Sequence, residues 1–265
     1  MTWIVAKSFM SGYVAVLSDV QVTWGNGKIR KDCLKKVYPV APNMVACFSG
    51  SVDIGFLLLS DLSNFIQSKT KPNELAMPRH VAHEWYRRAN KIFANQPKQQ
   101  QKLGCSIILA GTSPNERLGD APFERTDIIV FRNKKQFLPV FVPQMKTASI
   151  GSGSLFKAYI DFMNGVDEIK NMCSLMGAEN KPGGAGEQLA FLASIILQSN
   201  PKAGVSANVH CALVGTNYIE QFPLEFNSYV DDIKIEHKMP KVCETYNEFK
   251  NFENELNKTI GAGVA

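Results

Sequence analysis

The sequence lacks an apolar run long enough to cross a membrane and a basic tract of the kind that binds nucleic acid. None of its hydrophobic stretches approaches the roughly 18 consecutive apolar residues that a membrane-spanning helix needs. No charged segment precedes a short apolar core at the N-terminus, as a secretory signal requires. The net charge is only +5, and the basic residues are scattered along the chain. We therefore expect a cytoplasmic protein without nucleic-acid or membrane partners.

Cysteine and histidine are too sparse to form a recognisable metal site or a disulfide framework. The six cysteines are widely spaced, and several lie inside apolar, strand-like stretches, as free core thiols do. His80 and His83 lie three residues apart on an expected helix, but no carboxylate or cysteine near them completes a metal site. This usage of cysteine indicates a reducing compartment.

The order of strand-like and helix-like segments predicts an α+β fold without internal repeats. Residues 2–48 alternate β-branched and aromatic residues with Gly, Asn and Pro turns, which is typical of an antiparallel meander. Apolar residues at helical spacing predict helices over 54–66 and 78–95, and a second pair over 155–163 and 187–198. The stretch 96–101 is expected to be a loop. Pairs of helices between blocks of strand favour two stacked sheets with helices outside them.

Two regions are expected along the chain. Residues 1–225 carry the strand and helix pattern described above, with no linker inside it. Residues 226–265 form a charged C-terminal extension in which Tyr246, Phe249, Phe252 and Leu256 recur at helical spacing. We expect this extension to be helical and to pack either on the body of the protein or on a neighbouring molecule.

Thr2 follows Met1 directly and opens the apolar stretch Trp3–Ala6. If Met1 is removed, Thr2 carries both a hydroxyl and a free α-amine. The ordinary pKa of an α-amine is roughly 8, so near neutral pH part of it is unprotonated and can take the proton of the adjacent hydroxyl. A nucleophile and a base then lie on one residue. The alternative is that Thr2 is simply a good strand residue.

Five motifs occur together in one order along the chain. They are Thr2–Ala6, Ser18–Thr23, Leu34–Val37, Cys47–Ser51 and Ile150–Gly153. In this order and approximate spacing they resemble the proteasome β-subunit and HslV peptidase family, and the resemblance covers roughly residues 2–215. Each motif is weak by itself, whereas their joint order is fairly specific.

The resemblance implies a four-layer αββα sandwich of the N-terminal-nucleophile hydrolase type, assembled into a homo-oligomeric ring with its active sites inside. It implies a threonine protease that hydrolyses peptide bonds of a peptide or unfolded protein through an acyl-enzyme on Thr2. No metal or organic cofactor is implied. An ATPase or other regulator is a further implied partner.

The resemblance also assigns a role to each motif residue. Thr2 matches the nucleophile, Asp19 and Lys36 its charged partners, Gly50 the oxyanion-hole amide, and Ser152 the serine that supports the α-amine. A buried lysine beside the threonine would hold the pKa of the amine down and favour the ionised hydroxyl. Four of these residues also have ordinary structural interpretations. Asp19 is then a turn acid and Lys36 an exposed charge. Gly50 is then a strand cap and Ser152 a polar turn residue.

Two positions depart from the family pattern. Where the family places an acid and a serine before its final core strand, this chain has Asn200 and Ala203. The hydrogen-bond network around the α-amine is therefore expected to be thinner. The alternative function is a catalytically silent member of the same fold that serves as a ring scaffold or docking module.

Overall fold

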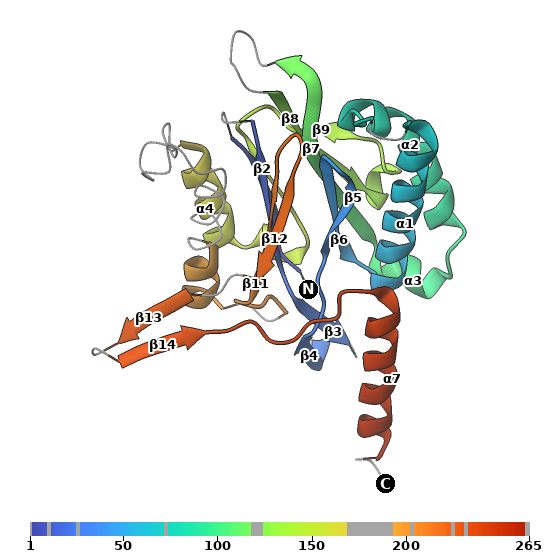
Figure 1. Cartoon of the computed structure of the whole chain (residues 1–265). Coiled ribbons are helices and arrows are strands. Elements are labelled where there is room, and N and C mark those ends of the chain that lie inside the picture. The colour runs from blue at the N-terminus through green and yellow to red at the C-terminus, as the bar shows by residue number, and fades with distance from the viewer. Residues whose placement is uncertain are drawn as a thin grey trace.

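Two five-stranded antiparallel sheets form the centre of the fold (Figure 1). The structure is a computed structural model, and it describes residues 2–9, 12–24, 27–71, 74–117, 124–168, 193–201, 204–223, 226–230 and 233–262. The first sheet has the order β10-β1-β2-β11-β12, with bounds Thr147–Ile150, Ile4–Ser8, Val14–Asp19, Val209–Val214 and Ile219–Pro223. The second has the order β5-β6-β7-β8-β9, with bounds Val37–Ala41, Met44–Gly50, Cys105–Arg117, Glu124–Arg132 and Val140–Phe141.

Two shorter strand pairs form separate two-stranded sheets. One joins β3 (Gln21–Trp24) to β4 (Ile29–Asp32), and the other joins β13 (Phe226–Val230) to β14 (Ile233–His237). The strands expected at the start of the chain are present, but they do not form one meander, because β1–β2, β3–β4 and β5–β6 are antiparallel pairs in three different sheets. Strand β4 was not indicated by the periodicity. Because β3 follows β2 after a single residue, the chain leaves the first sheet close to Asp19.

Alternation along β1 fixes which side of the first sheet faces the second. Ile4 and Ala6 belong to a buried cluster shared by both sheets, whereas Trp3 and Val5 belong to a cluster on the opposite face. Successive side chains of a strand point to opposite faces, so both faces of β1 are covered. This explains why every residue of the strand is buried. Continuing the alternation places Thr2 at the end of the face between the sheets.

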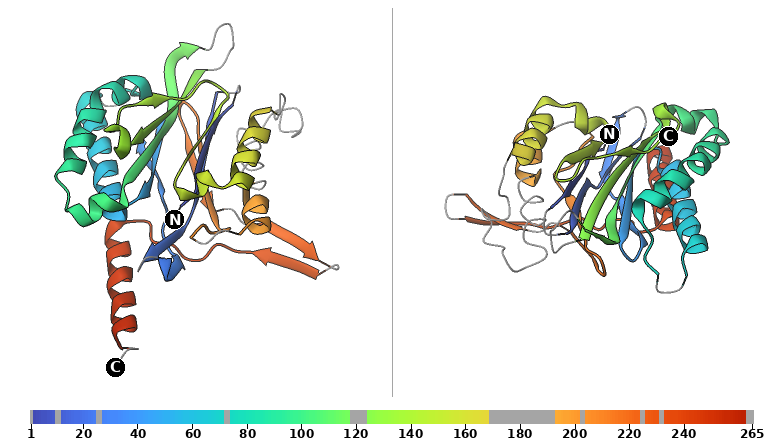
Figure 2. Two further views of the ribbon diagram at one scale, coloured as in Figure 1. Left: turned by 180° about the vertical axis from the view of Figure 1, so that it is seen from behind. Right: turned by 90° about the horizontal axis from the view of Figure 1, so that it is seen from above.

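Helices cover the outer faces of both sheets (Figure 2). Helix α1 (Val52–Lys69) and helix α2 (Pro78–Ala94) pack on the second sheet. Helix α4 (Lys157–Glu168) and the helical residues 193–199 lie on the first. Leu57 is one of the apolar residues at helical spacing in 54–66, yet it is 42% exposed, so the buried stripe of α1 is narrower than that spacing predicts. None of the described helices is long and apolar enough to span a bilayer.

The stretch predicted as a loop at 96–101 is partly helical. Helix α3 runs over Lys98–Leu103, directly before β7. It has no buried residue, so no apolar periodicity could mark it. Its position matters, because the turn that follows it, at Gly104, lies against the end of β6.

The C-terminal extension is helical over only part of its length. The hairpin β13–β14 precedes helix α7, which spans Tyr246–Ala262 and projects beyond the sheets (Figure 1). The start of α7 packs on the body of the protein, where Phe249 is buried and stacks on Trp24 with ring centroids 6.0 Å apart. The indole Nε1 of Trp24 donates to Glu253 Oε1 at 2.9 Å. Of the two packing partners left open for this helix, the structure brings it onto its own chain.

We expect Phe249→Ala to destabilise the protein by about 3 kcal/mol, since removing a buried phenylalanine loses apolar burial and leaves a cavity. Chemical denaturation followed by circular dichroism measures the change. Lys258→Ala, on the exposed part of the same helix, is the matched control and should change stability by less than about 0.5 kcal/mol. Equal stabilities of the two variants would show that the docking of α7 contributes little.

Candidate active site

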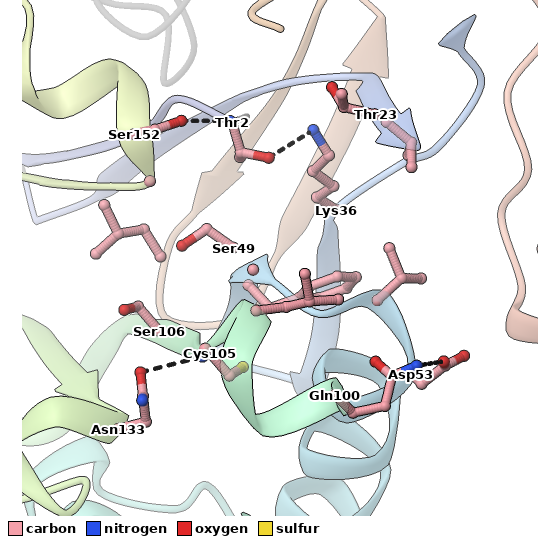
Figure 3. Close-up of a pocket in the computed structure, with 18 of the residues that line it drawn as sticks. Thr2, Thr23, Lys36, Ser49, Asp53, Gln100, Cys105, Ser106, Asn133 and Ser152 are labelled. Carbon is pink, nitrogen blue, oxygen red and sulfur yellow. Dashed lines mark hydrogen bonds between the residues drawn. The ribbon is translucent and has the colours of Figure 1, made fainter. Parts of the chain in front are cut away.

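The side chains of Thr2 and Lys36 point toward each other (Figure 3). Thr2 precedes β1, and Lys36 precedes β5 of the other sheet. Lys36 Nζ donates a hydrogen bond to Thr2 Oγ1 at 3.2 Å, and both side chains are buried. The hydroxyl of Thr2 is therefore held against a cationic group in a place with little water.

Each donor direction of the Lys36 ammonium group has an acceptor. Besides Thr2 Oγ1, the ammonium donates to Asp19 Oδ1 at 3.1 Å and to the main-chain oxygen of Gln21 at 2.7 Å. An ammonium group has three N–H donors, so this set satisfies it completely. The charged form of Lys36 is thus supported by hydrogen bonds in spite of its burial.

Asp19 ends β2 and is as deeply buried as Lys36. Its carboxylate accepts from the main-chain N–H of Trp3 at 2.9 Å and of Gln21 at 3.2 Å, in addition to Lys36. The bond from Trp3 ties the residue after Thr2 to the carboxylate. Asp19 therefore fixes the start of β1 as well as the lysine beside it.

Burial and mutual attraction act in opposite directions on this pair. Burial raises the pKa of the Asp19 carboxyl and lowers the pKa of the Lys36 ammonium, because it disfavours the charged form of each. The attraction between the two charges partly offsets both shifts. A lysine whose pKa is lowered exchanges its proton more readily with a neighbouring hydroxyl than an exposed lysine does.

Ser152 lies on the other side of Thr2. The main-chain nitrogen of Thr2 donates to Ser152 Oγ at 3.3 Å, and the nitrogen of Gly153 donates to Thr2 O at 3.0 Å. Gly151 has a φ of +91°, and a Cβ built there would lie 2.1 Å from Thr2 O. Only glycine allows this approach, so the turn around Ser152 is shaped to receive Thr2.

Gly50 ends β6 at the same edge of the fold. It has a φ of +104°, and a Cβ there would lie 2.3 Å from the carbonyl oxygen of Gly104. The nitrogen of Ser51 donates to that same oxygen at 2.9 Å. The backbone at Gly50 is thus in direct contact with the turn after α3, with no side chain to cover its amide.

These groups open into a cleft of about 660 Å³, within the roughly 300–1,000 Å³ typical of ligand pockets. Thr2, Lys36, Gly50 and Ser152 all line it. Helix α7 contributes Phe249 and Glu253 to the lining. The arrangement can hold a hydroxyl, a cation and a backbone amide next to one substrate-sized space.

The structure brings the five predicted site residues to one place. Four of them, Thr2, Asp19, Lys36 and Ser152, are joined by hydrogen bonds, and Gly50 shares the cleft with three of these. The motifs did not indicate that the main-chain oxygen of Gln21 accepts from Lys36, because every residue has the same main-chain atoms. Gln21 was visible only as part of the Ser18–Thr23 motif.

Asp32 is a second residue that the motifs did not single out. Its carboxylate accepts from Gln21 Nε2 at 3.0 Å and from Asn208 Nδ2 at 2.6 Å. Its charge also favours the protonated form of Lys36. Asp32 therefore supports, through Gln21, the segment whose main chain holds the lysine.

The two positions that depart from the family pattern are Asn200 and Ala203. The Asn200 side chain donates to Ile196 O at 3.4 Å, and the main-chain oxygen of Asn200 accepts from Tyr159 Oη at 3.0 Å. Among the described residues, none of the hydrogen bonds of Asn200 reaches Thr2. Ala203 lies outside the described residues. Within the described part of the chain, Asn200 therefore contributes no hydrogen bond to Thr2.

No known protein family model and no curated protein matches this sequence. Within the described part of the chain, no group of three or more His, Cys, Asp or Glu residues could hold a metal ion. The geometry of the site and the motif resemblance are therefore the basis for its function.

We expect Asp19→Asn to destabilise the protein by about 3–5 kcal/mol, because it leaves the buried ammonium of Lys36 without its counter-charge. The asparagine oxygen can still accept from the main-chain N–H of Trp3, so the loss of stability reports mainly on the missing negative charge. The measurement is urea denaturation at neutral pH.

The double variant Asp19→Asn/Lys36→Met serves as the control in a double-mutant cycle. It removes both charges, and we expect it to be more stable than Asp19→Asn alone. If the two single substitutions were additive in the double variant, the ion pair would not be coupled and this account of the site would be wrong.

Proposed function

We propose that this protein is a proteasome-like threonine peptidase of the N-terminal-nucleophile hydrolase type. The observation that carries the proposal is the Thr2 hydroxyl held 3.2 Å from the buried Lys36 ammonium, at the edge of a substrate-sized cleft. A buried lysine paired with a carboxylate has a substantial desolvation cost. Its contact with a threonine hydroxyl is what a nucleophile requires and what a purely structural ion pair does not.

The proposed reaction begins with cleavage of the chain directly before Thr2. The freed α-amine takes the proton of the Thr2 hydroxyl, and Oγ1 attacks the carbonyl carbon of the scissile peptide bond. The developing oxyanion faces the backbone N–H of Gly50. The tetrahedral intermediate then expels the amine product, which leaves with the proton, and water hydrolyses the remaining ester to regenerate Thr2.

Lys36 and Asp19 have separate parts in this scheme. The Lys36 ammonium favours the ionised form of the Thr2 oxygen and, as a like charge, disfavours protonation of the α-amine. Asp19 offsets the burial of that ammonium and orients it. Ser152, 3.3 Å from the Thr2 nitrogen, supports the amine and relays protons to it.

The proposal includes the fold type and the assembly. The two stacked sheets with helices on their outer faces support an αββα sandwich. We further propose a cytoplasmic homo-oligomeric ring that takes a peptide or unfolded protein, with an ATPase or other regulator as partner. Confinement of the cleft inside a ring would limit hydrolysis to unfolded chains.

A catalytically silent ring scaffold is the second candidate function. The observation that favours it is the hydrogen bonding of Asn200, which is directed away from Thr2. Without an acid or serine at that position, protons reach the α-amine through fewer groups. The same fold and assembly are expected for both candidates, so only chemistry at Thr2 distinguishes them.

We expect the protein to be a homo-oligomer in solution, since proteins of this architecture confine their sites within closed rings. Multi-angle light scattering at physiological salt measures the molar mass directly. A molar mass equal to that of one chain would contradict the proposed ring. The candidate active site within one chain would not be affected by that result.

We expect a preparation that starts at Thr2 to hydrolyse fluorogenic peptides, and one that retains Met1 to be slower by about 10²–10⁴-fold. The reason is that the Thr2 nitrogen is an amide when Met1 is attached, and an amide is not a base. Mass spectrometry of the intact protein verifies each N-terminus.

Thr2→Ala and Lys36→Ala are the inactive comparisons, and an epoxyketone probe, which closes a ring on both the hydroxyl and the amine, is the chemical test. Equal rates in all preparations would remove Thr2 from the mechanism. An assembled, Thr2-starting protein that neither turns over nor forms the adduct would favour the silent scaffold.

A further inference from the structure

Helix α7 is connected to the Gly50 turn by a continuous chain of side-chain contacts. Tyr246 Oη, at the start of α7, donates to Asp53 Oδ1 at 2.8 Å. The other oxygen of Asp53 accepts from Gln100 Nε2 at 2.8 Å, and Gln100 Oε1 accepts from Ser51 Oγ at 2.5 Å. Figure 3 shows Gln100 and Asp53 facing each other at the cleft. Ser51 directly follows Gly50.

The middle of this series of side-chain contacts lies on α3. The turn after α3 also contacts the backbone of Gly50. Gln100 belongs to α3, and Gly104, which follows α3, is the residue whose carbonyl oxygen accepts from Ser51 N. A Cβ at Gly50 would overlap that same oxygen. A displacement of α3 therefore displaces the backbone at Gly50.

Capping of α1 accounts for only part of these contacts. Ser51 Oγ accepts from the nitrogen of Ile54, as an N-cap does, and Asp53 is the acid of the first turn. Neither role needs a residue from α7. Tyr246 nevertheless reaches Asp53 across 193 positions of sequence, and Lys250 Nζ lies 3.5 Å from the same carboxylate.

We propose that the docked helix α7 positions the Gly50 amide for catalysis, with Tyr246, Asp53 and Gln100 as its positioning residues. The inference rests on the proposed peptidase function. A donor to an oxyanion must lie about 2.7–3.1 Å from it, and misplacement by about 1 Å costs roughly a hundredfold in rate. The C-terminal helix is then a part of the active site, since its first turn sets the position of the oxyanion donor.

Tyr246→Phe tests the proposal with the smallest change. It removes one hydroxyl and leaves the ring in its contact with Phe56, whose centroid is 5.3 Å away. We expect kcat to fall about three- to thirtyfold with KM unchanged. The affinity for a peptide boronate, whose tetrahedral adduct with Thr2 uses the oxyanion donor, should fall by a similar factor. Binding of a peptide substrate to the Thr2→Ala background should not change.

Two further variants make the result specific. Gln100→Met interrupts the series of side-chain contacts between Tyr246 and Ser51 at its middle. We expect it to lower kcat and boronate affinity as much as Tyr246→Phe does, and we expect the two effects not to add in the double variant. Tyr86→Phe is the matched control, since Tyr86 lies on α2 and its hydroxyl contacts only Arg87 among the interactions described for it. The control should leave kcat and boronate affinity at their wild-type values.

Hydrogen exchange provides a readout that does not depend on turnover. We expect the amides of 50–54 to exchange faster in Tyr246→Phe and Gln100→Met than in Tyr86→Phe. Unchanged kcat, unchanged boronate affinity or unchanged exchange in Tyr246→Phe would overturn the proposal. A wild-type protein that lacks turnover and boronate binding would instead overturn the peptidase function, and exchange would still decide whether α7 holds the Gly50 turn.

Discussion

The buried ion pair between Lys36 and Asp19 is the constraint on which the candidate site depends. Removing two charges from water costs several kcal/mol for each ion unless hydrogen bonds replace the lost solvation. Here the replacement is complete for the lysine, whose three donors contact Thr2, Asp19 and Gln21. Thr2 is one of those three acceptors. The position of its hydroxyl therefore follows from the requirement to satisfy a buried ammonium group.

The same requirement explains the path of the chain around the pair. Asp19 lies where β2 ends, and the chain then turns so that the main chain of Gln21 both donates to the carboxylate and accepts from the lysine. Asp32 holds the Gln21 side chain from the paired strand β4. The short β3–β4 ribbon is thus part of the support of the charged pair.

Close backbone contacts place the remaining groups. At both Gly50 and Gly151 a Cβ would overlap a carbonyl oxygen of another segment, that of Gly104 and that of Thr2 respectively. These two contacts join the turn after α3 to β6, and the turn before α4 to β1. The site is therefore assembled from segments that meet at one edge of the stacked sheets, and the extension after residue 225 joins them through α7.

The order of five motifs along the chain, through their resemblance to the proteasome β-subunit and HslV peptidase family, indicated which residues gather at this edge. A threonine after Met1, an acid at the end of a strand, a lysine before another strand and a glycine at a strand end are each ordinary features, so their joint order carried the information. Helical periodicity likewise located α1 and α2, because their buried stripes repeat at helical spacing.

Tertiary structure decided the rest, for three physical reasons. The acceptor role of the Gln21 main chain and the support from Asp32 depend on where the backbone turns, and every residue has the same backbone atoms. Helix α3 has no buried face, so it has no periodicity to detect. The docking of α7 and the direction of the Asn200 hydrogen bonds depend on which distant surfaces meet. The sequence by itself determined the chemical groups of the site, and only the packing of the two sheets, α3 and α7 determined how those groups are held.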